Sequence, residues 1–237
     1  MNLAKYMSGL MLLLLFLSCG KGFKNEEIIP EQSVTAKYFT TFKSLNPLVG
    51  RYDGWGSISI ISNQFWVRLK VNGSFSPVIH PQFIHLNGVC PTIKDDLNFD
   101  GFLDFAEAKK KIGSILLPLD GNLEGQIKGG NEFPQMRHRR ASYYYSESSD
   151  YMRMMKDLRS RDFIHNDSIV KLGHSEDLAL HQRVIMIYGV SEDFYLPSTV
   201  LSFDGLPSYL SLPIACGEIA EGAINPELMV QNQLISF

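Results

Sequence analysis

The sequence lacks the features that mark several common protein classes. Its 237 residues include only three cysteines and carry a net charge of −3, with a pI near 6.1. This balance offers nucleic acid no general basic surface, and the one short basic cluster is RHRR at 137–140. A G-x-S-x-G elbow, an H-E-x-x-H pair, a phosphate-binding loop and internal repeats are all missing. The sequence therefore favours neither an enzyme of those classes nor a nucleic-acid-binding protein.

A short apolar run lies near the N-terminus, but it is too short to span a membrane. Lys5 precedes eight apolar residues, Leu10 to Leu17, whereas a helix that crosses a bilayer needs about 20. A basic start, a short apolar stretch and a small residue before a cleavage point indicate an export signal over residues 1–18. LFLSC resembles the bacterial lipobox, which implies lipid attachment to Cys19 and anchoring in a bacterial cell envelope. The alternative is a plain signal peptide with an incidental cysteine.

The remainder divides into a polar segment and one large β-rich region. Residues 19–48 are polar and mixed, which is typical of a tether. Alternating runs at 56–61 and 65–71 predict a hairpin, and QRVIMIYGV at 182–190 predicts a buried strand. We therefore expect a single, mainly β domain over residues 49–237.

Two stretches have the apolar spacing of helices. In FAEAKKKIGSI, Phe105, Ala108 and Ile112 share one face, and Gly113 is a stop signal. SSDYMRMMKDLRS carries an apolar stripe through Met154 and Met155. Thioethers suit Cu(I), so the methionines could alternatively bind a soft metal, but core packing explains the spacing.

The most specific motif is DLNFDGFLDFAE, residues 96–107. Calcium takes six to eight oxygens, and a twelve-residue EF-hand loop supplies them from positions 1, 3, 5, 7, 9 and 12, with glycine at position 6. The corresponding donors here are Asp96, Asn98, Asp100, the carbonyl of Phe102, Asp104 and Glu107, with Gly101 at the turn. The sequence predicts a calcium site; the alternative is an acidic turn that leads into a helix.

The residues before this loop do not continue the EF-hand pattern. LNGVCPTIKD precedes the loop, and Gly88 and Pro91 stand where an entering helix should lie. Calcium sensors generally pair two such loops and reorient their helices. One loop with only an exiting helix therefore predicts structural calcium in an insertion near residues 91–120.

The cysteine count depends on the lipid anchor. Three cysteines leave one unpaired in an exported protein. If Cys19 carries lipid, Cys90 and Cys216 remain as a pair in an oxidising compartment, and we predict a disulfide between them. The alternative is two buried free thiols.

Three separated stretches resemble parts of the copper/zinc superoxide dismutase and CHRD type of β-sandwich. They are HPQFIHLNGVCP at 80–91, QRVIMIYGV at 182–190 and LPIACGEI at 212–219. The resemblance implies a Greek-key β-sandwich with two short helices in insertions. It also implies the Cys90–Cys216 disulfide, because the dismutases join a cysteine after the histidine strand to one in the final strand. The chain is more similar to exported bacterial CHRD-like lipoproteins than to the enzyme.

The metal ligands that the dismutase resemblance implies are mostly missing. His80 and His85 do not form a His-x-His pair, and their odd offset puts them on opposite faces of a regular strand. Tyr188 stands where the late copper histidine is expected, and no histidine lies between Cys90 and residue 120. We expect hydrogen-bonded structural histidines and no copper or zinc, with a residual metal site on His80 and His85 as the alternative.

Two functions remain compatible with the sequence. The first is a non-enzymatic, membrane-anchored lipoprotein whose calcium-stabilised domain binds an envelope protein or a glycan. The tyrosines of ASYYYSESSDY, at 141–151, could stack on such a partner, although alternating Tyr143 and Tyr145 equally fit an ordinary strand. The second is a divergent superoxide-reacting or metal-handling protein that uses His80 and His85.

Overall fold

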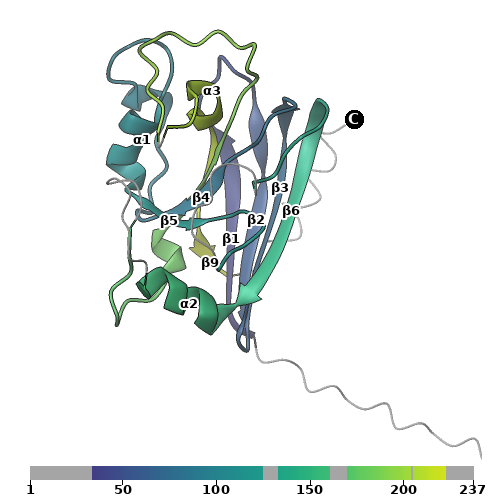
Figure 1. Ribbon diagram of the computed structural model, residues 1–237, viewed down its shortest axis with the longest axis vertical. Coiled ribbons are helices and arrows are strands. Elements are labelled where there is room, and N and C mark those ends of the chain that lie inside the picture. Colours follow the sequence, from purple (N-terminus) through teal and green to yellow (C-terminus); the bar gives the residue numbers. More distant parts are fainter. Residues whose placement is uncertain (1–33, 125–132, 161–169, 204, 223–237) are drawn as a thin grey trace, which may run out of the picture. The chain divides into compact units, whose positions relative to one another are not determined.

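The core of the protein is an antiparallel β-sheet. The computed structural model describes residues 34–124, 133–160, 170–203 and 205–222. Eight strands follow the order β5-β4-β7-β8-β1-β2-β3-β6, and β9 pairs with β1 beside β8 (Figure 1). All of the pairings between these strands are antiparallel. The expectation of a mainly β protein is confirmed.

The elements have the following bounds. The strands are β1 (Val34–Ser44), β2 (Tyr52–Ile61), β3 (Gln64–Phe75), β4 (Gln82–His85), β5 (Ile115–Pro118), β6 (Arg140–Asp150), β7 (Val184–Tyr188), β8 (Pro213–Glu218) and β9 (Ala220–Glu221). The α-helices are α1 (Phe105–Ile112), α2 (Tyr151–Ser160) and α3 (Ser208–Ser211), and the 3-10 helices are η1 (Ile93–Asp95) and η2 (Leu180–Gln182).

The predicted hairpin forms from β2 and β3. Ile61 pairs with Gln64, so only Ser62 and Asn63 connect the two strands. Side chains of β2 alternate between buried and partly exposed or exposed along the strand. This period of two is the pattern of a sheet with one buried face.

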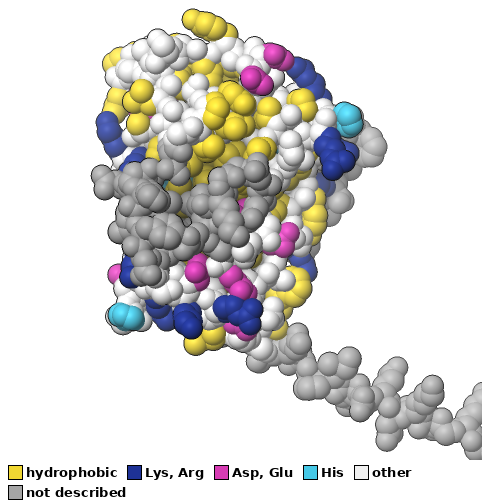
Figure 2. Space-filling model, in the orientation of Figure 1, with side chains coloured by type: hydrophobic (Ala, Val, Ile, Leu, Met, Phe, Trp, Pro, Cys, Tyr) yellow, Lys and Arg dark blue, Asp and Glu magenta, His cyan; other side chains and the backbone are white. Residues whose placement is uncertain are grey.

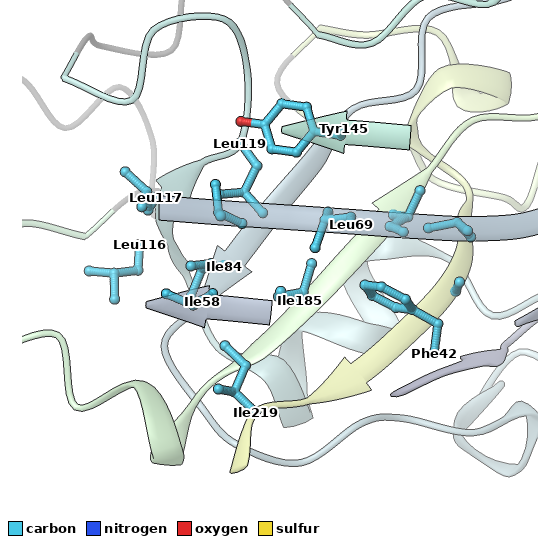
Figure 3. Close-up of a cluster of buried hydrophobic side chains, with 14 of the residues drawn as sticks. Phe42, Ile58, Leu69, Ile84, Leu116, Leu117, Leu119, Tyr145, Ile185 and Ile219 are labelled. Carbon is cyan, nitrogen blue, oxygen red and sulfur yellow. The ribbon is translucent and has the colours of Figure 1, made fainter. Parts of the chain in front are cut away.

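The sheet curls, because strands from opposite parts of its order share one core. Ile58 of β2 and Leu69 of β3 belong to the same buried cluster as Ile84 of β4 and Ile185 of β7 (Figure 3). β4 and β7 are buried along their whole length, so they are covered on both faces. The run VIMIY of β7 is accordingly apolar without alternation, whereas β4 (QFIH) also buries the polar side chains of Gln82 and His85.

A second core lies between α1 and the other face of these central strands. Phe83, Met186 and Tyr188 pack with Phe105 and Ile112 of α1. Burial of this helix face explains why a short, lysine-rich segment is helical, since isolated helices of this length are marginal in water. The two predicted helices are confirmed as α1 and α2, and α3 is a short helix that the sequence pattern did not predict.

β1 corrects the predicted extent of the tether. Residues 19–48 have the composition of a tether, but residues 34–44 form β1, whose register with β2 runs from Val34↔Ile61 to Lys43↔Asp53. Thr40 and Phe42 are buried, at 2% and 3% exposure, while Lys43 is exposed. The outward lysines and threonines make the composition polar and mask the alternation of a strand. The sheet therefore begins within the segment assigned to the tether.

Candidate functional site

The predicted calcium loop connects η1 to α1 and is shaped by its own acidic side chains. Asp96 accepts hydrogen bonds from the Phe99 amide at 2.7 Å and from the Gly101 amide at 2.9 Å. Gly101 has φ 89° and Phe99 has φ 59°, so the chain turns sharply here, and glycine adopts such a φ without a Cβ penalty. The carboxylate at the first loop position thus holds the turn at the sixth.

The next two predicted ligands repeat one local motif. Asn98 Oδ1 accepts from the Asp100 amide at 2.9 Å, and Asp100 Oδ1 accepts from the Phe102 amide at 2.9 Å. Such Asx turns fix the side-chain rotamer against the backbone two residues on. These turns therefore orient the side chains at positions 3 and 5 of the loop.

The end of the loop is locked to helix α1 and to the start of the loop. Asp104 caps α1 by accepting from the Glu107 amide at 2.9 Å, and Glu107 Oε2 accepts from the Asp104 amide at 3.1 Å. Glu107 Oε1 accepts from the Leu97 amide at 2.7 Å and from the Asn98 amide at 3.2 Å. The glutamate at position 12 thus closes the loop onto its own beginning.

Three of these carboxylates are buried and have no positive partner among the described residues. Asp96, Asp104 and Glu107 are 8%, 1% and 8% exposed. Lys111 pairs with Asp95, which lies just before the loop, at 2.9 Å between Nζ and Oδ2. None of the ion pairs in the described part of the chain includes a carboxylate of residues 96–107. Burial of several negative charges costs free energy unless a cation compensates for it.

The donors fit a hard cation in their chemistry, although they are not arranged as a finished coordination shell. Across the described residues, no three His, Cys, Asp or Glu side chains are grouped closely enough to hold a metal ion. The loop carboxylates instead accept amide and hydroxyl hydrogens. A carboxylate oxygen has a second lone pair, so it can keep such a bond and also bind calcium.

Buried polar contacts join the loop to the rest of the domain. Asn46 Oδ1 accepts from the Leu103 amide at 2.8 Å, and Asn46 Nδ2 donates to the carbonyls of Leu103 and Pro213 at 3.0 and 2.8 Å. Asp104 Oδ2 accepts from the Leu201 amide at 2.8 Å. Asn46 was not identified from the sequence, because one asparagine in a polar stretch carries no motif.

A disulfide anchors the segment that enters the loop. Cys90 and Cys216 are bonded, with Cα atoms 5.8 Å apart, which confirms the predicted pair. Cys216 lies in β8 and is 1% exposed. The bond therefore ties the chain just before the acidic loop to a central strand.

The two candidate metal histidines are both buried, and hydrogen bonds occupy the ring of His85. Burial lowers the His85 pKa to about 3, so its ring is neutral at physiological pH. Its Nδ1 lies 3.2 Å from the Gly113 carbonyl and its Nε2 lies 3.0 Å from the Tyr188 hydroxyl. Burial raises the Tyr188 pKa, so the phenol stays protonated and donates to Nε2. Nδ1 is then the donor to Gly113, and no nitrogen of His85 remains for a metal.

His80 lies in a different part of the core. Its Nδ1 is 3.1 Å from the Tyr188 carbonyl and its Nε2 is 3.3 Å from the Ser76 carbonyl. Burial lowers its pKa, and a neutral ring donates through only one nitrogen. Its ring packs beside Phe75 and Tyr143, whereas the ring of His85 packs beside Phe83 and Tyr188. The two rings therefore pack against different aromatic side chains, and each hydrogen-bonds a different group of Tyr188.

The remaining candidate residues lie either in the hydrophobic core or outside the described residues. Met154, Met155 and Leu158 are buried in the main hydrophobic cluster, as core packing predicts. Cys19 and the predicted signal peptide lie outside the described residues. Among the residues that are described, no helix has the length and apolar character needed to cross a membrane.

Comparison with known proteins gives no independent assignment. No protein-family model matches the chain, and no curated protein matches it significantly in sequence. The chain's own residues are therefore the basis for its function.

Proposed function

We propose that this chain is an exported, lipid-anchored envelope protein whose β domain is stabilised by one structural calcium ion and serves binding instead of catalysis. One observation carries the calcium assignment. Asp96, Asp104 and Glu107 are buried in a single loop, and no basic side chain in the described residues pairs with them.

The electrostatics of the loop favour a bound cation. Each of these carboxylates also accepts backbone hydrogen bonds, which orient its oxygens. Neighbouring negative charges repel one another, and low exposure weakens the screening by water. A divalent ion among them removes this repulsion, so binding is coupled to stability of the loop.

The donor types favour calcium over other metals. Residues 96–107 contain carboxylates, an amide and backbone carbonyls, with no histidine or cysteine. Protein zinc and copper sites are built around histidine nitrogen or cysteine sulfur, which this loop lacks, and magnesium usually keeps several waters in strict octahedral geometry. A loop with six spaced oxygen donors suits the larger and more flexible shell of calcium.

The surroundings of the loop support a structural role for the ion. A three-residue 3-10 helix, η1, precedes the loop where a sensor would have a long entering helix. Asn46 and the Cys90–Cys216 bond fix the loop to β1, β8 and their connections. We therefore propose that calcium holds the insertion between β4 and β5 in place and does not drive a helix rearrangement.

The sequence signal and the disulfide together support location in the envelope. Disulfides persist in oxidising compartments, and LFLSC resembles a lipobox. A Greek-key sandwich of the superoxide dismutase and CHRD type remains our proposal for the fold, supported by the antiparallel sheet and by the bond from Cys90 to β8. No copper or zinc centre is proposed on His80 and His85, because their rings lie in separate packing environments and hydrogen-bond there.

Calorimetric titration of the purified, metal-free protein tests the calcium assignment. We expect one calcium ion per chain, with an affinity of about 10⁻⁴ to 10⁻³ M, as in other extracellular modules. Magnesium at the same concentration should compete weakly. No heat of calcium binding, or stoichiometric copper with consumption of superoxide, would contradict the proposal.

A further inference from the structure

A basic and aromatic hollow lies at the β6 side of the sheet, away from the calcium loop. It has a volume of about 670 Å³ and is lined by residues that include Lys70, Met136, Arg137, Arg140, Ser142 and Tyr144. Its size falls within the range of roughly 300 to 1,000 Å³ that small-ligand sites occupy. A second hollow shares Met136 and Tyr144 with it, so Tyr144 stands between two adjacent recesses.

The strand register places an aromatic side chain on each side of Lys70. Lys70 of β3 is directly opposite Trp55 of β2 and Tyr144 of β6. Residues directly opposite each other in antiparallel strands point to the same face, so the three side chains form one row. Tyr144 is 59% exposed, while its neighbours Tyr143 and Tyr145 are buried. The row therefore presents one ammonium group between two aromatic rings.

The next row toward the β2–β3 turn has hydroxyl groups and a second cation. Arg68 of β3 is opposite Ser57 of β2 and Ser146 of β6. The Arg68 guanidinium lies 5.7 Å from the centre of the Trp66 ring on the same strand. This face thus combines cations, aromatic rings and hydroxyl groups.

The positive charges of the hollow are not neutralised within the described chain. Lys70, Arg137 and Arg140 take part in none of the ion pairs found among the described residues. The whole chain has a net charge of −3, so this local excess of positive charge runs against the overall balance. In Figure 2, basic and acidic side chains lie in small mixed groups at the lower end of the face shown.

We infer that this hollow binds an anionic glycan, a sugar chain that carries carboxylate groups. Arginine pairs with carboxylates through two parallel hydrogen bonds, and lysine adds a point charge. An exposed tyrosine offers a flat apolar ring with a polar tip, which suits the face of a sugar, and serines bond sugar hydroxyls. The inference specifies the class of ligand for the binding role proposed above, and it rests on that role. It does not depend on calcium.

The concave shape favours a sugar chain over an anionic membrane surface. A hollow receives one or two sugar rings with their carboxylates among the three basic side chains. Attraction to a lipid surface needs only exposed charge and no hollow. A glycan site and a membrane-binding surface predict different binding partners, so one experiment can distinguish them.

Titration of the full chain carrying Cys19→Ser, which has no lipid of its own to insert into vesicles, with tetragalacturonate, followed by calorimetry, tests the inference. Cellotetraose of equal length is the uncharged control, and phosphatidylglycerol vesicles are the membrane control. We expect saturable binding of tetragalacturonate that weakens with added salt, and no comparable binding of cellotetraose. Equal binding of both sugars, binding to vesicles alone, or no binding to any of the three would overturn the inference.

Two variants assign the binding to the hollow. Lys70→Gln combined with Arg140→Gln removes two charges, and we expect affinity for tetragalacturonate to fall at least about tenfold, since each charge-assisted bond contributes more than a neutral one. Tyr144→Thr keeps a β-forming residue and should weaken binding about fivefold or more. Unchanged affinity in both variants would contradict the assignment.

Matched substitutions elsewhere control for charge and for folding. Lys156→Gln on α2 combined with Arg51→Gln before β2 removes the same charge outside the hollow and should leave the affinity unchanged. A cooperative thermal melt near the parent melting temperature in every variant shows that the domain is folded. Loss of sugar binding with an unchanged melt supports the hollow, whereas absence of a calcium-dependent melting shift in the parent protein refutes only the calcium proposal.

Discussion

The Tyr188 hydroxyl lies 3.0 Å from His85 Nε2, and both side chains are fully buried. The phenol thus occupies the position at which a metal would approach this histidine. We expect Tyr188→Phe to destabilise the protein by about 1 to 3 kcal/mol, because it leaves a buried acceptor without a donor. Urea unfolding of the variant measures this change.

Tyr195→Phe is the matched control, because Tyr195 is 84% exposed and so lies outside the hydrophobic core. We expect this control to unfold at the parent concentration of urea. Equal stability of Tyr188→Phe and the parent would show that the contact with His85 is not a stabilising hydrogen bond.

His85 should make stability depend on pH. Its folded-state pKa is lowered to about 3 by burial, whereas the unfolded ring titrates near 6.5. The unfolded state therefore binds more protons between these values, and stability is lost as the pH falls below about 6.5. His85→Gln should reduce the slope of unfolding free energy against pH by about 1.4 kcal/mol per pH unit in this window. The same slope in both proteins would contradict a neutral, buried His85.

The buried hydrogen bonds of Asn46 lead to a further prediction for the loop. Asn46→Ala removes three hydrogen bonds and leaves the polar backbone groups of Leu103 and Pro213 buried. We expect a loss of about 3 kcal/mol and weaker calcium binding, because each unsatisfied buried group costs about 1 to 3 kcal/mol. Asn72→Ala, which breaks one exposed bond to Asp53, is the control and should cost less than about 1 kcal/mol. Equal effects would argue against a special role of Asn46.

Reduction of the disulfide should lower stability without removing the calcium site. The chain-entropy model gives a loss of at most about 4 to 5 kcal/mol for a loop that spans 126 positions. We expect the double variant Cys90→Ala and Cys216→Ala to unfold at lower urea and still bind calcium at reduced affinity. A variant as stable as the parent would mean that the disulfide does not measurably reduce the conformational entropy of the unfolded chain.

Local pattern predicted much of the fold, and tertiary context determined the remainder. The alternation in residues 56–71 and the apolar spacing from Phe105 to Ile112 correctly predicted the β2–β3 hairpin and α1. β1 was missed because its outward side chains are polar, and its inward Thr40 and Phe42 are recognisable only once β2 pairs with it. The order of strands in the sheet depends on contacts between distant residues, which periodicity does not record.

The candidate site was likewise predictable only where its residues lie close together in the sequence. The loop from Asp96 to Glu107 could be found because all of its expected donors lie within twelve residues. Asn46 joins the loop from 57 positions away, and the row of Trp55, Lys70 and Tyr144 exists only through strand register. Contacts of this kind follow from the fold and have no local sequence signal.

Thermal melting with calcium and with chelator tests the central claim most directly. At a calcium concentration 100 times the dissociation constant, binding to the folded state alone adds about 2.7 kcal/mol of stability. Glu107→Gln should lose this increment, whereas Glu192→Gln, an exposed residue outside the loop, should keep it. Identical melting of the parent protein in calcium and in chelator would contradict a structural calcium ion in the loop.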